Sequence, residues 1–307
     1  MKILFHVAVG NTDRPSRWQA IGRFYTDLAE SFETLGHDCF MVIHKSAVTD
    51  GIFEKNKVVN KVAKLKGHAF RPDVVFTWNG ISDGDRQMID LYGAEKFIYS
   101  ELGFFDHYKT CYFDFSGTNF TSMNLVEDLS DVRYEQAAFD QLVENYQKDR
   151  LYEGRYIFVP LQDEGDTQIT KLSPFKTMKA FLEYVLQLYA FDKDLKILFK
   201  KHPSAPCEVP EDDRLVEVFE NVHHYLPYAE NVVGVNSTVL FETLLYHQRI
   251  LSVGLGIASR RFNSDEERKS FIMNCLAKQL YHTELADPKV IEKSWFYKKM
   301  ISTFSLE

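Results

Sequence analysis

Two lysines, a histidine and a serine follow a short apolar run in the segment Asp194–Ser204, DLKILFKKHPS. The run Leu195–Phe199 has the composition of a strand that is buried on both faces. In open α/β sheets, ligands bind at the carboxyl ends of the strands, where Lys201 and His202 would lie. Ammonium and imidazole groups favour a phosphate ligand, although a histidine after a strand is also often an ordinary polar residue.

A pair of hydroxyl side chains, Ser237 and Thr238, lies between the predicted strand Asn231–Val235 and the predicted apolar helix Val239–Tyr246. Such hydroxyls either cap the helix or bind an anion together with the first-turn amides. The two roles are compatible, because one hydroxyl can cap while the other contacts a ligand. Glu242 lies one helical turn after Thr238, where it would accept hydrogen bonds from a ribose or remain a solvated charge.

An acidic loop, Gln162–Thr170 (QDEGDTQIT), follows the predicted strand Tyr156–Leu161. Acidic loops are usually solvated, but this one follows a strand and therefore lies at the same edge as the lysines. Gly165 permits a close approach next to Asp166. A carboxylate at this place, such as Asp166, can serve as a nucleophile or as a base.

Glu101 ends the predicted strand Phe97–Ser100 and is followed by a glycine and two phenylalanines. Aromatic surroundings raise the pKa of a carboxyl group, which suits acid/base work, whereas the alternative is a simple edge charge. Asn79 ends the strand Val74–Thr77 in the same way and is a candidate for binding a sugar hydroxyl. We expect Glu101 and Asp166 to face each other from two domains, as carboxylates do in glycosyl chemistry.

The elements that position these residues form two successive strand–helix arrays. The first begins with the strand Ile3–Val9, the helix Trp18–Leu35 and the strand Cys39–Ile43, without the GxGxxG fingerprint of dinucleotide binding. We predict an α/β protein with two Rossmann-like domains facing each other across a cleft. Residues 1–150 form the first domain and residues 151–307 the second, and the terminal helix 288–304 crosses back to the first domain.

Local signals predict further helices. Val58–Lys66 has helical spacing, and Ser173 followed by Pro174 predicts a helix that continues to about Leu188. His223–Ala229 is predicted as a short helix.

Bulk composition excludes several classes of function. Of the 307 residues, 45% are hydrophobic and 26% charged, and the net charge of −8 argues against a broad nucleic-acid surface. No run approaches 18 apolar residues, so any membrane contact would be peripheral. The four cysteines show no CxxC spacing, which indicates reduced thiols in a cytosolic protein rather than a zinc site: Cys39, Cys111, Cys207 and Cys275.

Four segments together resemble a known enzyme family. They are ELGFF at 101–105, QDEGD at 162–166, KHP at 201–203 and YLPYAENVVGVNSTVLFE at 225–242. In order and spacing they resemble bacterial capsule and lipopolysaccharide glycosyltransferases of the β-Kdo transferase type. The HP and Ser/Thr segments are also similar to those of CMP-sialic acid transferases and poly(glycerol phosphate) transferases.

The resemblance implies a GT-B fold and a CMP-Kdo donor. By position, it makes Asp166 the nucleophile and Glu101 the acid/base. His202, Ser237 and Thr238 would contact the CMP phosphate, and Gln162 would orient the donor.

The implied reaction moves Kdo from the CMP-sugar to a glycan or lipid-linked glycan acceptor. The expected route retains the anomeric configuration by way of Asp166, and the alternative is an inverting route in which one carboxylate acts as a base without a covalent adduct. Lys200 or Lys201, with His202, would stabilise the departing CMP, so no metal or other cofactor is expected. The alternatives are a sialic acid or glycerol phosphate transferase, or an inactive nucleotide- or glycan-binding module. The expected location is the cytoplasm, at the inner face of the inner membrane.

Overall fold

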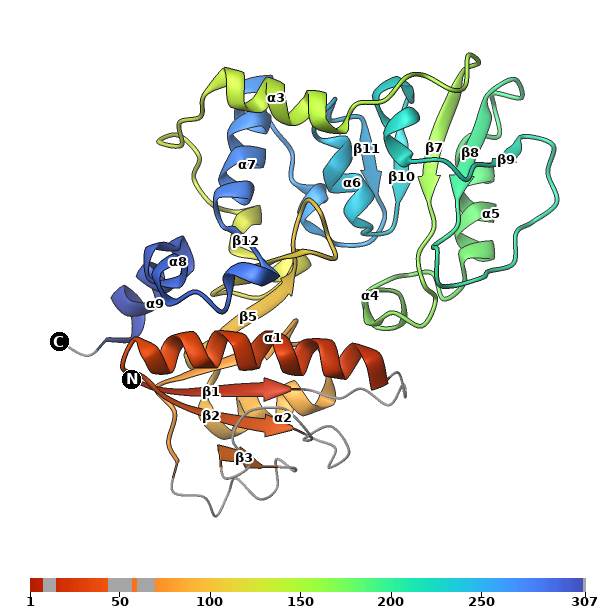
Figure 1. The fold of residues 1–307 in the computed structure, drawn as a ribbon. Coiled ribbons are helices and arrows are strands. Elements are labelled where there is room, and N and C mark those ends of the chain that lie inside the picture. Colours follow the sequence, from red (N-terminus) through yellow and green to blue (C-terminus); the bar gives the residue numbers. More distant parts are fainter. Residues whose placement is uncertain (8–14, 44–56, 60–69, 306–307) are drawn as a thin grey trace. The chain divides into compact units, whose positions relative to one another are not determined.

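A computed structural model describes most of the chain, and Figure 1 shows its course. Contacts between residues divide the chain into two compact units, which are described separately. The first unit comprises Met1–Met123 and Leu276–Glu307, and the second comprises Asn124–Cys275. The described residues are 1–7, 15–43, 57–59 and 70–305, with the backbone alone described for 15–20, 58, 59 and 167.

The first unit is built on a seven-stranded sheet with the order β12-β6-β5-β4-β1-β2-β3. Its centre is parallel, whereas β6 pairs antiparallel with both β5 and β12. Its strands are β1 Lys2–Val7, β2 Asp38–Ile43, β3 Val58–Val59, β4 Val74–Trp78, β5 Phe97–Leu102, β6 Thr110–Asp114 and β12 Gln279–Tyr281. Its helices are α1 Pro15–Thr34, α2 Asp83–Tyr92, α8 Pro288–Lys293 and α9 Trp295–Phe304, with 3₁₀ turns at Ala94–Lys96, Asn119–Thr121 and His282–Glu284.

Helices cover both faces of this sheet, which explains the continuous apolar runs of its strands. Successive side chains of a strand point to opposite faces. Phe5 accordingly packs in one core with α1, α8 and α9, whereas Leu4 packs in another with Met88 of α2.

The end of the described chain returns to the first unit, as predicted. Phe296 of α9 is buried and stacks on Phe113 of β6, with ring centroids 4.0 Å apart. The predicted single helix 288–304 is two helices, because the Ser294 backbone is extended and its side chain accepts a hydrogen bond from Tyr297 N to cap α9.

The second unit is built on a five-stranded parallel sheet with the order β11-β10-β7-β8-β9. Its strands are β7 Tyr156–Pro160, β8 Lys196–Lys200, β9 Leu215–Glu217, β10 Val232–Gly234 and β11 Ile250–Ser252. Its helices are α3 Gln136–Tyr146, α4 Thr167–Thr170, α5 Met178–Leu188, α6 Thr238–Thr243 and α7 Asp265–Ala277. 3₁₀ turns lie at Met123–Leu125, Val222–His224, Leu226–Tyr228 and Ile257–Ser259.

Three of the predicted local elements are wrong. Val58 and Val59 form strand β3 beside β2, which β-branched residues favour, and residues 60–66 of that predicted helix lie outside the described residues. Helix α5 begins at Met178 and is capped by Thr177, whereas Ser173 closes a local turn by accepting a hydrogen bond from Phe175 N. The predicted helix His223–Ala229 is two 3₁₀ turns, with Pro227 in the second.

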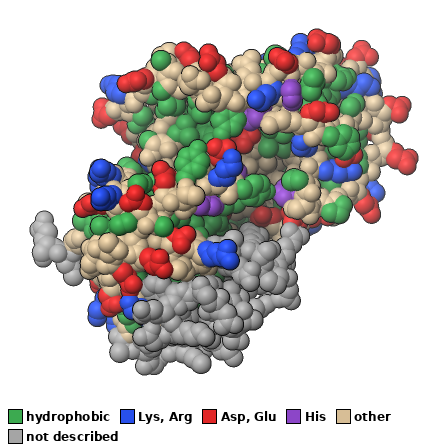
Figure 2. All heavy atoms as spheres, viewed as in Figure 1, with side chains coloured by type: hydrophobic (Ala, Val, Ile, Leu, Met, Phe, Trp, Pro, Cys, Tyr) green, Lys and Arg blue, Asp and Glu red, His purple; other side chains and the backbone are tan. Residues whose placement is uncertain are grey.

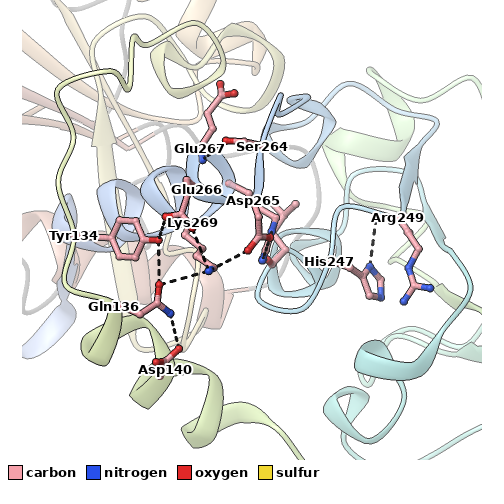
Figure 3. Close-up of polar contacts among 12 residues, drawn as sticks. Tyr134, Gln136, Asp140, His247, Arg249, Ser264, Asp265, Glu266, Glu267 and Lys269 are labelled. Atoms are coloured by element: carbon pink, nitrogen blue, oxygen red, sulfur yellow. Dashed lines mark hydrogen bonds and ion pairs between the residues drawn. The ribbon is translucent and has the colours of Figure 1, made fainter.

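The predicted domain boundary at residue 150 stays a prediction. Contacts group residues 124–150, including α3, with the second unit and residues 276–307 with the first. Within the second unit, Tyr134 and Gln136 contact Glu266 and Lys269 of α7 (Figure 3). These contacts tie α3 to α7.

Charged side chains of both signs are interspersed over the face drawn in Figure 2. All four cysteines are free thiols in the described structure.

A buried polar cluster joins the ends of β1 and β4 to the start of α2. Asp85 accepts hydrogen bonds from Thr77 Oγ1 at 2.5 Å and from Ser82 N at 2.9 Å, and its Oδ1 lies 3.0 Å from His6 Nδ1. His6, Thr77 and Asp85 are fully buried. Burial alone would raise the pKa of Asp85, but the contacts with His6, Thr77 and Ser82 outweigh it and lower that pKa. The cluster therefore holds a stable buried carboxylate.

His247, in the turn after α6, should make the stability of the protein depend on pH. Its Nε2 donates to Leu226 O at 2.9 Å, and its Nδ1 accepts from Arg249 N (Figure 3). Burial, followed by the charge of Arg249, lowers the pKa from 6.5 to about 4. The unfolded chain therefore binds a proton more readily, and the free energy of unfolding should fall between pH 6.5 and 4, by at most about 3 kcal/mol.

Urea unfolding at pH 7.5 and pH 4.5 measures this dependence, and His247→Gln is the matched variant. The glutamine amide keeps an N–H donor for Leu226 O but does not titrate. We expect the variant to lose less stability than the wild type on acidification. Equal losses in the two proteins would contradict the role of His247.

Candidate functional site

The carboxyl edge of the five-stranded sheet collects the predicted donor-side residues. Strands β10, β7 and β8 are adjacent and parallel, so their carboxyl ends lie side by side at spacings of about 4.8 Å. Gln162 follows β7, Lys201 and His202 follow β8, and Ser237 and Thr238 follow β10. The structure thus brings together residues that are up to 76 positions apart in the sequence.

Gln162 is held at this edge by side-chain amide contacts. Its Nε2 donates to Asn236 Oδ1 at 3.0 Å, and its Oε1 accepts from Asn236 N at 3.1 Å. Asn236 Nδ2 in turn donates to Gln168 Oε1 at 2.9 Å. This network links the ends of β7 and β10 to α4. It fixes the backbone from which Ser237 and Thr238 project.

Each carboxylate of the acidic loop accepts a backbone hydrogen bond. Asp163 Oδ1 accepts from Gly165 N at 2.9 Å, and Glu164 Oε1 accepts from Met178 N at 2.7 Å, at the start of α5. Asp166 Oδ1 accepts from Gln168 N at 2.9 Å and so caps α4. The Asp166 side chain is partly exposed, so its carboxylate is oriented by the helix while remaining within reach of solvent.

His202 carries its ring proton on Nε2 when it is neutral. Ser204 N, which can only donate, faces His202 Nδ1 at 3.4 Å, and Ser204 Oγ lies 3.1 Å from the same nitrogen. Nδ1 is therefore the acceptor, and Nε2–H is the donor that can bind an anion.

The two lysines of the segment have different surroundings. Lys201 Nζ lies 3.0 Å from Glu217 Oε2 in a half-exposed ion pair. Lys200 Nζ donates to Phe219 O at 2.6 Å and also to Glu220 O. Burial lowers the pKa of Lys200. Because Lys200 secures the 219–220 backbone, Lys201 is the better candidate for an anionic ligand.

Ser237 is the N-cap of α6, and its Oγ accepts from Val239 N at 3.3 Å. Thr238 is the first residue of the helix and is partly exposed. Capping is thus assigned to the first hydroxyl, and Thr238 is the hydroxyl that remains a candidate for contact with a ligand.

Glu242 belongs to a partly buried cluster. Its Oε2 lies 3.3 Å from His223 Nε2, and His223 Nδ1 lies 2.8 Å from the Tyr246 hydroxyl. Burial, then the charge of Glu242, raises the pKa of Tyr246, which keeps its hydroxyl protonated. Glu242 is therefore oriented by His223 rather than being a simple solvated charge.

The first-unit candidates, Asn79 and Glu101, lie at the carboxyl ends of adjacent parallel strands. Asn79 N donates to Ser100 O at 3.0 Å, which places Asn79 next to the residue before Glu101. Asn79 adopts a φ of 43°, and its Oδ1 accepts from Ile81 N at 3.2 Å. Glu101 is partly buried, and its Oε1 accepts from Leu102 N at 2.9 Å. The expectation that Glu101 faces Asp166 stays a prediction.

The loop after Glu101 is shaped by a strand from the far end of the sequence. Gln279 Oε1, in β12, accepts hydrogen bonds from Phe104 N at 2.7 Å and Phe105 N at 3.1 Å. A Cβ added to Gly103 would lie 2.1 Å from Thr110 Oγ1, so a glycine is needed here. These contacts explain why the ELGFF segment contains a glycine followed by a rigid turn.

Part of the chain matches a known family model. Residues 122–262 match the family model described as "Capsule polysaccharide biosynthesis protein". The match covers just under half of the chain. All candidates of the second unit lie inside it, whereas Asn79 and Glu101 lie outside. No curated protein matches the chain.

Two solved structures from Thermosulfurimonas dismutans resemble the chain. The structure titled "KpsC, beta Kdo 2,7 transferase" is 16% identical with a TM-score of 0.56, and the match covers 94% of this chain and 100% of that one. The structure titled "KpsC, beta Kdo 2,4 transferase" is 12% identical with a TM-score of 0.51, and covers 87% and 89%. At these identities the likeness concerns the fold. The predicted α/β, GT-B class and the predicted resemblance to the capsule family are confirmed.

Several residues of this capsule-family segment escaped the sequence analysis. They are Glu164, Gln168 and His223, which support α5, Asn236 and Glu242, respectively, through the contacts given above. Each lies far in sequence from the residue or element it supports, or is an ordinary polar residue in a loop. For Glu164, its place in the acidic loop is the sequence signal that could have identified it.

The described residues show neither a metal-binding cluster nor a membrane-spanning helix. They contain no group of three or more His, Cys, Asp or Glu side chains arranged to hold a metal ion. Among the described helices, none is both long enough and apolar enough to cross a membrane.

Proposed function

We propose that this protein is a glycosyltransferase that moves Kdo from CMP-Kdo to a glycan acceptor during capsule or related surface polysaccharide synthesis. The acceptor is a growing glycan or lipid-linked glycan that is reached from the cytoplasmic face of the inner membrane. The observation that supports the proposal is the set of polar residues at the carboxyl edge of the five-stranded sheet. There, Gln162, His202 and Thr238 converge from three adjacent strands inside the segment that matches the capsule family.

On the donor side, the phosphate of CMP binds between His202, Lys201 and the start of α6. His202 Nε2–H and the Thr238 hydroxyl donate to its oxygens, and the Lys201 ammonium balances the charge. Glu242, oriented by His223, accepts from the ribose hydroxyls. CMP departs as a charged phosphate that these groups stabilise, so proton transfer to the leaving group is unnecessary.

In the proposed retaining reaction, Asp166 attacks the anomeric carbon as the bond to the CMP phosphate breaks. A covalent Kdo–Asp166 ester forms. Glu101 then takes the proton from an acceptor hydroxyl, whose oxygen displaces Asp166 from the anomeric carbon. Asn79 contributes a hydrogen bond to the acceptor sugar.

The test is to trap the covalent intermediate with Glu101→Gln. This variant lacks the base for the second step, so incubation with CMP-Kdo should release CMP and leave one Kdo on the protein. Intact-mass spectrometry should show a mass increase of one Kdo residue, and peptide mapping should locate it at Asp166.

CMP-sialic acid is the matched control donor. Adduct formation with it instead of CMP-Kdo would overturn the assigned sugar. The absence of CMP release with either donor, together with tight CMP binding, would favour an inactive binding module. Transfer with no adduct in any variant would indicate an inverting route and contradict the nucleophile.

A further inference from the structure

Phe219 is a large apolar side chain that the described fold leaves in solvent. It is 75% exposed, although Val218 immediately before it is buried. An exposed aromatic ring loses the free energy that its burial would provide, so an exposed ring next to a ligand site is a candidate for a contact with that ligand.

The position of Phe219 along the sheet edge is defined by the strand register. Strand β9 lies next to β8 and parallel to it, with Glu217 opposite Phe199. Val218 N continues the pairing by donating to Phe199 O at 2.9 Å. Two residues beyond Glu217, Phe219 therefore comes level with Lys201, and both lie at the carboxyl edge of the sheet.

The backbone that carries the ring is held firmly. Lys200 Nζ donates to the carbonyls of Phe219 and Glu220. The Tyr225 hydroxyl donates to Glu220 Oε2 at 2.6 Å, and the Tyr225 ring stacks on buried Phe158. The exposed ring thus projects from an anchored turn, which limits the entropy lost when it orders against a ligand.

Along the sheet edge, the residues proposed to bind phosphate follow other strands than the one that Phe219 follows. Thr238, Gln162 and His202 occupy three successive strand ends, β10, β7 and β8, and Phe219 occupies the next one, β9. With strands about 4.8 Å apart, the backbone of Phe219 lies one strand spacing beyond that of His202. A ribose separates the base of a nucleotide from its phosphate by a comparable length. Glu242, which is proposed to bind the ribose, contacts His223, four residues after Phe219. Aromatic rings bind bases by stacking, which tolerates any base because each has a π face.

We infer that Phe219 is the stacking platform for the pyrimidine base of the nucleotide donor. This inference rests on the proposed function, because it assumes that the phosphate of CMP binds at Lys201 and His202. It gives the contacts of Lys200 with the 219–220 backbone a purpose, which is to hold the platform in place. The ring contributes affinity for the base, and the groups on β8 and β10 contribute affinity for the phosphate.

Calorimetric titration with CMP, and competition with ribose 5-phosphate, which lacks a base, test the inference. We expect Phe219→Ala to weaken CMP binding about 10-fold and to leave the affinity for ribose 5-phosphate unchanged. Phe219→Tyr, which keeps an aromatic ring, should retain the wild-type affinity for CMP. By contrast, His202→Ala should weaken the binding of both ligands.

Phe191→Ala is the matched control. Phe191 is 83% exposed, but it lies in the turn between α5 and β8, at the amino edge of the same sheet. Its removal should leave CMP binding unchanged. Wild-type CMP affinity in Phe219→Ala, or an equal loss for CMP and ribose 5-phosphate, would overturn the stacking role alone. A wild-type protein that binds no CMP would overturn the proposed donor site as well.

Discussion

Asp166→Asn should abolish glycosyl transfer while the protein stays folded and binds CMP normally. The amide has no negative charge with which to attack the anomeric carbon, so the rate of transfer should fall by at least about 1,000-fold. Its side-chain oxygen can still accept the hydrogen bond from Gln168 N that caps α4. Steady-state transfer from CMP-Kdo and calorimetry with CMP give the two measurements.

Asp166→Ala separates catalysis from capping. This variant should lose transfer to the same extent, and it should also lose the cap of α4 at a cost of about 1 kcal/mol. Asp163→Asn, in the same loop, is the control and should keep most of the transfer activity. Substantial transfer by Asp166→Asn would show that the carboxylate is a capping group and not the nucleophile.

Asp85→Ala should be the most destabilising single substitution in the first unit. It removes the acceptor that Thr77 and Ser82 share and leaves those donors, and buried His6, without it. Removing the charged acceptor of a buried hydrogen-bonded cluster costs about 3–5 kcal/mol, because the other groups stay desolvated. Urea unfolding at pH 7.5 measures the loss.

Asp90→Ala provides the comparison on the same helix. Asp90 is exposed in the last turn of α2, and its removal should change the free energy of unfolding by less than about 0.5 kcal/mol. Similar small losses for both variants would mean that the buried cluster contributes little to stability.

The central strands of both sheets are predictable from the sequence because a strand buried on both faces requires a continuous apolar run, whereas the short edge strands β3, β9 and β12 lack such a run. Lys2–Val7 and Tyr156–Pro160 are examples. The clustering of Gln162, His202 and Thr238 also follows, since polar residues after parallel strands meet at one edge. The donor-side residues are thus predicted by the rule that ligands bind at the carboxyl ends of parallel strands.

Contacts between distant loops are not predictable in the same way. Glu164 caps α5, and His223 orients Glu242, through side chains whose types are common in solvated loops. Ser173 followed by Pro174 has the pattern of a helix start, yet α5 begins at Met178. Local propensity is a weak preference there, and the capping of α5 by Thr177 and Glu164 decides where the helix starts.

The first unit is made of two separate stretches of sequence, because β12, α8 and α9 follow the second unit along the chain. Residues 124–275, which include all five strands of the second unit, emerge from the ribosome before Gln279 and Phe296 do. The aromatic surface that Phe296 later covers, including Phe113, stays open during that time. The second unit is therefore able to fold while the first unit still lacks its C-terminal elements. The ELGFF loop, which depends on Gln279, takes its final shape among the last events of synthesis.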